Sequence, residues 1–131
     1  MVIKKKYHFY AAHRNELLKD KCYNLHGHVY RFKVYVKTNK KEGKINVLFN
    51  DIDKYIGPML ESFDHGCFVH KNDLKLMKAL EILGTKKYIL DEPSSTEHIA
   101  EVIFHTAENL GLPIVKIELT ETESSTVIYE P

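Results

Sequence analysis

Two segments in the first third of the chain alternate between apolar and polar residues. Residues 2–13 and 28–38 keep a period of two over many positions. Such a period is typical of a β-strand that buries one of its faces. The inward faces are Tyr7, Phe9, Ala11 and His13 in the first segment, and His28, Tyr30, Phe32, Val34 and Val36 in the second. We therefore predict two strands, which could pair antiparallel with each other.

The pattern changes from strand to helix between residues 38 and 62. The sequence "TNKKEGK" (38–44) contains Gly43 and precedes "INVLFN" (45–50), an order typical of an antiparallel hairpin. We therefore expect a third strand over 45–50. From Asp51 to Ser62 apolar residues recur at helical spacing, although Gly57-Pro58 is expected to weaken or kink the helix.

Two further helices are predicted in the second half of the chain. Residues 73–83 have helical periodicity and end at Gly84, after which "KKYIL" is a brief extended piece. A longer apolar stripe follows Ser94 and stops at Gly111. Ser94 and Glu97 have the spacing of a capping box, so we expect Ser94 to be the N-cap of this helix.

The C-terminal segments alternate again. In "IVKIELTE" (114–121) the residues Val115, Ile117, Leu119 and Glu121 share one face, and "STVIYE" predicts a last strand or hairpin arm. The elements together predict a single α+β domain over residues 1–131. Its sheet is expected to be antiparallel, with about four strands and with helices on one face.

Composition narrows the classes of partner. Hydrophobic residues make up 44% of the chain and the formal net charge is +1, which gives no broad surface for nucleic acid or membranes. The first residues lack the apolar core of a signal peptide, and no apolar run is long enough to span a bilayer. We expect a cytoplasmic protein that binds neither nucleic acid nor membrane, with Cys22 and Cys67 as free thiols.

The sequence "CYNLHGHVYR" (22–31) holds the first candidate site. His26 and His28 lie two residues apart at the start of a strand, so their side chains point to the same side. His13 ends the inward face of the neighbouring predicted strand. Three such imidazoles would make a zinc site with one open position. The alternative is that all three are ordinary polar residues at strand ends.

Cys22 and the pair Asp64–His65 are candidates for proton transfer. Cys22 lies four residues before His26, and it is either a fourth ligand that closes the metal site or a nearby base or nucleophile. In "FDHG" (63–66) a carboxylate could orient an imidazole as an acid–base dyad. The alternative for this pair is a polar turn at the end of a helix.

Glu121 is the one acid that falls in phase with inward apolar residues. An ionised carboxylate on an inward face is costly unless hydrogen-bond donors meet it. Glu121 either breaks the pattern at the end of its strand or binds the donors of a ligand. The residues alone leave both interpretations open.

Five separated motifs give the chain a family resemblance. The segments "YHFYAAHR", "CYNLHGHVYRF", "FDHG", "PSSTEHIAEVI" and "LTETESSTVIY" have the order and spacing of the 6-pyruvoyltetrahydropterin synthase / 6-carboxytetrahydropterin synthase family, and they cover nearly the whole chain. The resemblance implies a catalytic zinc ion on His13, His26 and His28. It also implies a tunnelling fold in which subunits join sheets into a barrel as a homo-oligomer, a trimer or hexamer, with active sites between neighbouring chains.

The same resemblance implies roles for further residues. Cys22 would be the catalytic cysteine and Asp64–His65 the catalytic dyad, while Glu121 would anchor the pterin. Substrate contacts before the long helix would fall on Thr96 and Glu97, although the capping box competes for the Glu97 carboxylate. The triphosphate of the substrate needs cations, and those nearest the motif in sequence are Arg14, Lys19 and Lys21.

The spacing of the cysteine motif bears on the product. Three residues separate Cys22 from His26, which resembles the 6-carboxytetrahydropterin synthases of 7-deazaguanine and queuosine biosynthesis. The implied reaction converts 7,8-dihydroneopterin triphosphate to 6-carboxytetrahydropterin with loss of acetaldehyde and triphosphate. The alternatives are 6-pyruvoyltetrahydropterin synthase, which has the same residues and another product, and a non-catalytic module that binds zinc or pterin.

Overall fold

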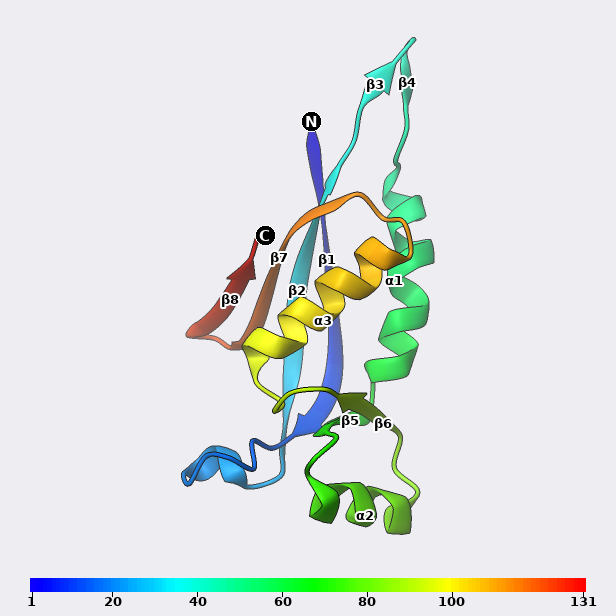
Figure 1. Ribbon diagram of the computed structural model, residues 1–131. Coiled ribbons are helices and arrows are strands. Elements are labelled where there is room, and N and C mark those ends of the chain that lie inside the picture. Colours follow the sequence, from blue (N-terminus) through cyan, green and yellow to red (C-terminus); the bar gives the residue numbers. More distant parts are fainter.

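The computed structural model describes residues Met1 to Pro131, and its centre is a six-stranded sheet of order β6-β5-β1-β2-β7-β8 (Figure 1). The strands are β1 (Val2–His13), β2 (His26–Lys37), β5 (Gly66–His70), β6 (Lys87–Leu90), β7 (Ile114–Thr122) and β8 (Ser125–Tyr129). The predicted α+β class is confirmed. The predicted sheet of four antiparallel strands is wrong, because two of the six strands run parallel to β1.

The two N-terminal strands form the longest ladder of the sheet. β1 and β2 pair antiparallel without a break from Val2↔Lys37 to His13↔His26. The predicted inward faces are confirmed, since Phe9 is 1% exposed and Tyr30 is fully buried. β2 begins two residues earlier than predicted, so the His-Gly-His sequence lies within the ladder and not before it.

The parallel strands β5 and β6 account for most of the difference from the predicted sheet. β5 pairs parallel with β1 at Ala11↔Gly66 and parallel with β6 from Cys67↔Lys87 onward. All five residues of β5 are buried. A strand covered on both faces has a continuous apolar run instead of an alternation, so "GCFVH" gave no period-two signal. The extended piece predicted at "KKYIL" is confirmed as β6.

The third strand predicted over 45–50 is wrong. Only a two-stranded ribbon forms there, from β3 (Lys40–Lys41) and β4 (Lys44–Ile45), and it lies outside the main sheet. The Asn46 side chain accepts hydrogen bonds from the Thr38 hydroxyl and from the Asn39 N–H, at 2.9 and 2.6 Å. These bonds turn the chain away from the sheet and towards the first helix.

Helix α1 (Phe49–Phe63) begins two residues before the predicted start and runs through Pro58. It begins early because the Asp51 carboxylate accepts the Leu48 N–H at 2.8 Å. α1 and α3 (Thr96–Asn109) cover one face of the sheet, whereas α2 (Leu74–Leu83) lies at its lower end in Figure 1. The core between sheet and helices includes Phe9, Tyr30, Phe32, Ile52, Ile56, Ile99 and Ile103. None of the helices is long and apolar enough to cross a membrane.

The N-cap of α3 differs by one residue from the prediction. The hydroxyl of Ser95, not of Ser94, accepts the N–H of His98 at 3.2 Å. The residue at the capping-box position is therefore His98, and the Glu97 side chain is not used for capping. Ser94 is fully buried and serves the site described next. The helix ends at Asn109, just before the predicted Gly111, whose φ is +100°.

Candidate active site

Three histidines converge on the inner face of the β1–β2 ladder. His13 lies directly opposite His26, and His28 lies opposite Ala11 on the same face. Their ring centroids are 4.6 Å apart for His13–His26, 4.8 Å for His26–His28 and 5.1 Å for His13–His28. One potential ligand atom from each residue lies within 4.8 Å of the other two. The sequence prediction that these three side chains meet is confirmed.

Backbone carbonyls fix the orientation of two of the imidazoles. The Nδ1–H of His13 donates to the Ser94 carbonyl at 2.8 Å, and that of His26 donates to the Asn24 carbonyl at 2.6 Å. Because a carbonyl only accepts, each Nε2 keeps its lone pair free. Metal-binding histidines usually donate their other ring N–H to an acceptor of this kind, which fixes the orientation of the ring. Sequence reasoning missed Ser94 and Asn24, since backbone groups leave no signature in side-chain identity.

The free nitrogens fit a divalent metal ion. The Nε2 atoms of His13 and His28 are buried and have no hydrogen-bond partner, an arrangement that is unfavourable unless something fills the gap. Burial also lowers the pKa of both imidazoles below the ordinary value of histidine, which favours the neutral form that binds metals. Three imidazoles with one position open is the ligand set of catalytic zinc sites.

Glu121 lies beside these imidazoles because of a β-bulge. The pairing of β7 with β8 shifts between Thr120 and Thr122, so Glu121 is the extra residue; such bulges redirect side chains next to functional sites. Its carboxylate lies 3.5 Å from His28 Nε2 and 3.9 Å from His13 Nε2. The Thr96 hydroxyl donates to it as well. The bulge confirms that Glu121 breaks the strand pattern near the end of β7. The contacts of its carboxylate also agree with the other interpretation, that it binds the donors of a ligand, and this role stays a prediction.

A cavity of about 420 Å³ opens beside Glu121. Its walls come from three parts of the chain: the β1–β2 connection, the start of α3 and the β7–β8 hairpin. The lining residues are Asn15, Leu18, Cys22, Ser94, Ser95, Thr96, Glu97, Glu121, Ser124, Ser125, Thr126 and Val127. Four residues that the sequence singled out, Cys22, Thr96, Glu97 and Glu121, thus face one space. Most of the other lining residues carry hydroxyl or amide groups suited to a polar ring.

Cys22 follows Asp20 in a single 3₁₀ turn at the edge of this cavity. Its sulfur is not part of the three-histidine group. Burial and the neighbouring Asp20 carboxylate raise the pKa of the Cys22 thiol above its ordinary value. The chain by itself therefore keeps the thiol protonated at neutral pH, and we expect a thiolate only when positive charge enters the cavity.

Asp64 and His65 form a hydrogen-bonded pair. His65 Nδ1 lies 2.8 Å from one Asp64 oxygen, and the other oxygen accepts the Tyr10 N–H at 2.9 Å. The Tyr10 amide and the imidazole together hold the pKa of the Asp64 carboxyl below its ordinary range. His65 has φ +59°, a left-handed conformation that is rare outside glycine, and its N–H donates to the Tyr10 carbonyl at 2.6 Å. Such conformations are often found at functional positions.

The pair does not reach the three histidines of its own chain. The His65 ring packs against Tyr10, with centroids 5.6 Å apart. Tyr10 points outward, between the inward residues Phe9 and Ala11 of β1. His65 therefore lies on the face of the sheet opposite His13, and its side chain is 76% exposed.

Of the three cations nearest in sequence to the cysteine motif, Arg14 is already paired. Its guanidinium donates two hydrogen bonds to Asp73, at 2.7 and 2.6 Å. Lys19 and Lys21 are exposed and have no carboxylate partner. Arg14 is therefore not a free cation for a phosphate group.

Comparison with known proteins identifies relatives over the full chain. A family model described as "6-pyruvoyl tetrahydropterin synthase" matches residues 2–131. The 6-carboxy-5,6,7,8-tetrahydropterin synthase of Synechocystis sp. is 31% identical, over 98% of this chain and 92% of its own. The protein of the same name from Haemophilus influenzae is 27% identical, over 98% of this chain and 97% of its own.

Solved structures have the same fold. The 6-pyruvoyl tetrahydropterin synthase of Caenorhabditis elegans superposes with a TM-score of 0.71 and 24% identity, over 100% of this chain and 95% of that one. An uncharacterized protein from Wolinella succinogenes gives a TM-score of 0.78 with 17% identity, over 99% and 97% of the two chains. These two likenesses concern the fold alone. With the sequence match from residue 2 to residue 131, they place the chain in the 6-pyruvoyl tetrahydropterin synthase family.

Proposed function

We propose that the protein is a zinc-dependent lyase, a 6-carboxy-5,6,7,8-tetrahydropterin synthase of 7-deazaguanine and queuosine biosynthesis. Its substrate is 7,8-dihydroneopterin triphosphate, and acetaldehyde and triphosphate leave. The relatives of that name support the activity. The observation that carries the proposal is the three-histidine cluster with free Nε2 atoms, beside a cavity that Cys22 and Glu121 both line.

The residues of the cavity have separate tasks in this reaction. When bound by His13, His26 and His28, zinc supplies a Lewis acid that polarises substrate oxygens and acidifies the adjacent C–H bonds. Cys22 Sγ accepts and returns a proton at the side chain of the pterin. Glu121 accepts hydrogen bonds from the amino-pyrimidine edge of the ring, a charge-assisted contact that fixes the orientation of the substrate. Thr96 holds the carboxylate for this contact, and Glu97 faces the same space without a competing cap.

The acid–base dyad is supplied by another copy of the chain in this proposal. Asp64 and His65 lie on the outer face of the sheet, away from their own three histidines. A homo-oligomer that joins sheets into a barrel, a trimer or hexamer, brings the outer face of one chain towards the cavity of the next. Each chain would then contribute Cys22 to one active site and His65 to another.

A mixture of two inactive variants tests this arrangement. Cys22→Ala and His65→Ala are each expected to lose turnover. After the two variants are unfolded and refolded together in equal amounts, activity should return to about one quarter of the wild-type value, because a quarter of the sites combine intact groups at random. Refolding of each variant alone is the control. If the mixture stays inactive while refolded wild type recovers, Asp64 and His65 do not act across chains.

Glu121→Gln is expected to weaken substrate binding more than it changes stability. Without substrate the Glu121 carboxylate still has partners, since the Thr96 hydroxyl donates to it and two imidazoles face it. The amide keeps the shape but presents an NH₂ group where the pterin needs an acceptor, which costs roughly 1–3 kcal/mol of binding. The measurements are the Kd for a pterin and the Tm. Glu123→Gln, the same substitution at an exposed position of the β7–β8 hairpin outside the cavity lining, is the matched control; unchanged pterin affinity in Glu121→Gln would make Glu121 a purely structural acid.

Incubation of the zinc-loaded protein with 7,8-dihydroneopterin triphosphate, followed by mass spectrometry of the pterin, tests the proposed function itself. We expect 6-carboxytetrahydropterin together with acetaldehyde. A 6-pyruvoyl product would instead assign the protein to the other activity of its family. If the protein binds pterin and zinc but forms no pterin product, it is a non-catalytic binding module.

A further inference from the structure

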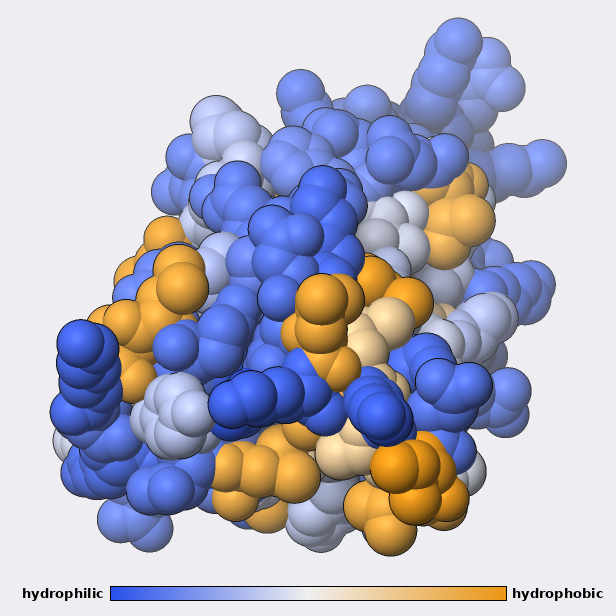
Figure 2. Space-filling view, turned by 60° about the horizontal axis from the view of Figure 1, so that its bottom comes forward, coloured by the Kyte–Doolittle hydropathy of each residue, from blue (hydrophilic) through white to orange (hydrophobic).

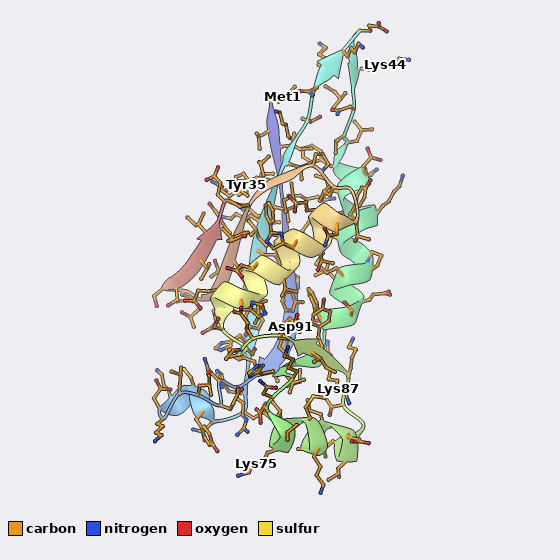
Figure 3. The ribbon with its side chains drawn as sticks, in the orientation of Figure 1. Met1, Tyr35, Lys44, Lys75, Lys87 and Asp91 are labelled. Atoms are coloured by element: carbon orange, nitrogen blue, oxygen red, sulfur yellow. The ribbon has the colours of Figure 1, made fainter.

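The connection between β1 and β2, residues 14–25, carries Cys22 and lies beside α2 at the lower end of the molecule (Figures 1 and 3). It joins two of the metal-site histidines, His13 and His26, and it lines the cavity with Asn15, Leu18 and Cys22. Its only regular structure is one 3₁₀ turn, Lys21–Tyr23. Something else must hold it, because proton transfer requires the Cys22 sulfur at a defined place.

Apolar burial does not hold this connection. Its leucines are largely exposed: Leu17 to 68%, Leu25 to 51% and Leu18 to 42%. Figure 2 views the lower end of the molecule and shows apolar side chains as separate patches on a mostly hydrophilic surface. A loop that buries so little apolar area gains little rigidity from the hydrophobic effect.

Two polar side-chain pairs hold it instead; one partner is the last residue of β5 and the other is the N-cap of α2. Arg14 donates two hydrogen bonds to Asp73, and the Asp73 side chain is only 3% exposed. Glu16 pairs with His70, whose side chain is 9% exposed. A forked contact between guanidinium and carboxylate fixes direction as well as distance. The start of the connection is therefore attached rigidly to the end of β5 and the start of α2.

Two further contacts connect this attachment to Cys22. The guanidinium carbon of Arg14 lies over the ring of Tyr23, 4.9 Å from its centroid, and Tyr23 follows Cys22 directly. The Asn15 N–H, next to Arg14, donates to the Cys22 carbonyl at 2.9 Å. Arg14 thus contacts the residue after Cys22, and its chain neighbour holds the Cys22 backbone.

From these contacts we infer that Asp73 is a positioning residue for the Cys22 thiol, acting through Arg14 and Tyr23. It lies outside the cavity and touches neither the three histidines nor the lining residues. The inference rests on the proposed role of Cys22 in the reaction. The hydrogen bonds that orient His13 and His26 go to Ser94 and Asn24 and not to Asp73, so zinc binding and thiol placement can be measured separately.

Asp73→Asn is the variant that separates these roles. Asp73 is also the N-cap of α2, accepting the Leu76 N–H at 3.3 Å, and asparagine caps helices as well as aspartate does. The substitution therefore removes the charge that binds Arg14 and keeps the cap. The matched control is Lys75→Gln, labelled in Figure 3 on the first turn of α2, which changes one exposed charge without touching the connection.

The readouts are kcat, KM, bound zinc and the rate at which iodoacetamide alkylates Cys22. Cys67 does not interfere with the alkylation, because it is 2% exposed and burial raises the pKa of its thiol to about 11. In Asp73→Asn we expect kcat to fall by about 10²-fold, as for a misplaced catalytic group, with KM changed little. Bound zinc should match the control, and the alkylation rate should rise because the connection opens.

The inference would be overturned if Cys22 in Asp73→Asn were alkylated at the same rate as in the wild type. It would also be overturned if kcat fell only because zinc was lost. If Asp73→Asn does not fold, Tyr23→Leu replaces it, since Tyr23 is 42% exposed and its loss removes the contact with Arg14 without unpairing a buried charge. The same rise in alkylation with retained zinc is then expected, and its absence overturns the inference. If the wild-type protein shows no pterin turnover, the proposed function fails, while the alkylation rates still decide whether Asp73 holds Cys22.

Discussion

Replacement of Cys22 by alanine is expected to abolish turnover and leave bound zinc unchanged. The thiol lines the cavity beside Glu121 and does not belong to the three-histidine group, so its loss removes a proton-transfer group and no metal ligand. Loss of such a group typically lowers the rate by ~10²-fold or more. Steady-state kinetics with the pterin triphosphate, together with metal analysis of the same preparation, measures both effects.

Cys67→Ala is the control for loss of a thiol as such. Cys67 is buried in β5, where its thiol donates to the Phe68 carbonyl at 3.4 Å, so we expect the variant to keep its activity. Full activity in Cys22→Ala would exclude Cys22 as the base. Loss of zinc in Cys22→Ala would instead make the cysteine a fourth ligand, and the metal site would then be closed.

Replacement of His26 by alanine is expected to remove the zinc. A site with three imidazole ligands keeps only two after this change, and two ligands bind zinc too weakly to retain it during purification. His26 is only partly buried and has one hydrogen bond, to the Asn24 carbonyl, so the fold should tolerate the change. Added zinc should raise the Tm of the wild-type protein by mass action and leave that of His26→Ala unchanged.

His8→Ala is the matched control for this experiment. His8 lies on β1 like His13, but it is exposed and sits at an outward position of the strand. Its zinc content and zinc-dependent Tm shift should equal those of the wild type. Equal zinc in His26→Ala and His8→Ala would contradict a metal site at the three histidines.

The sequence patterns predicted those elements that have one buried and one solvated face. β1 and β2 were predicted because Phe9, Phe32 and their in-phase neighbours alternate with charged residues. α2 was predicted from its periodicity together with Gly84, which adopts the left-handed conformation at the C-cap. In these elements local pattern and tertiary environment agree.

The missed elements depend on contacts that no local pattern records. β5 is buried on both faces between β1 and β6, which removes the alternation. The strand expected at 45–50 was predicted from the Gly43 loop before it, but Asn46 and Asp51 bind the backbone and the chain enters α1 instead. The N-cap of α3 is Ser95 and not Ser94, whose hydroxyl lies 3.3 Å from His13 Nδ1 instead of at the start of the helix.

The candidate site was predictable in its residues and not in its geometry. In-phase spacing was sufficient to bring His13, His26 and His28 together. The contact of Glu121 with them needed a bulge that only the pairing with β8 reveals. Likewise, the dipeptide Asp64–His65 does not show that His65 has φ +59° and faces away from its own cavity.

The placement of all three imidazoles on one hairpin bears on how the protein folds. β1 and β2 are consecutive strands, whereas β2 pairs with β7 from the far end of the chain. Contacts between segments close in sequence form sooner than contacts between distant ones, so we expect the metal site to assemble before the cavity exists. A slip of one residue would turn His13 away from His26. Zinc bound to the nascent hairpin would therefore select the correct alignment of the two strands while the rest of the chain is still unfolded.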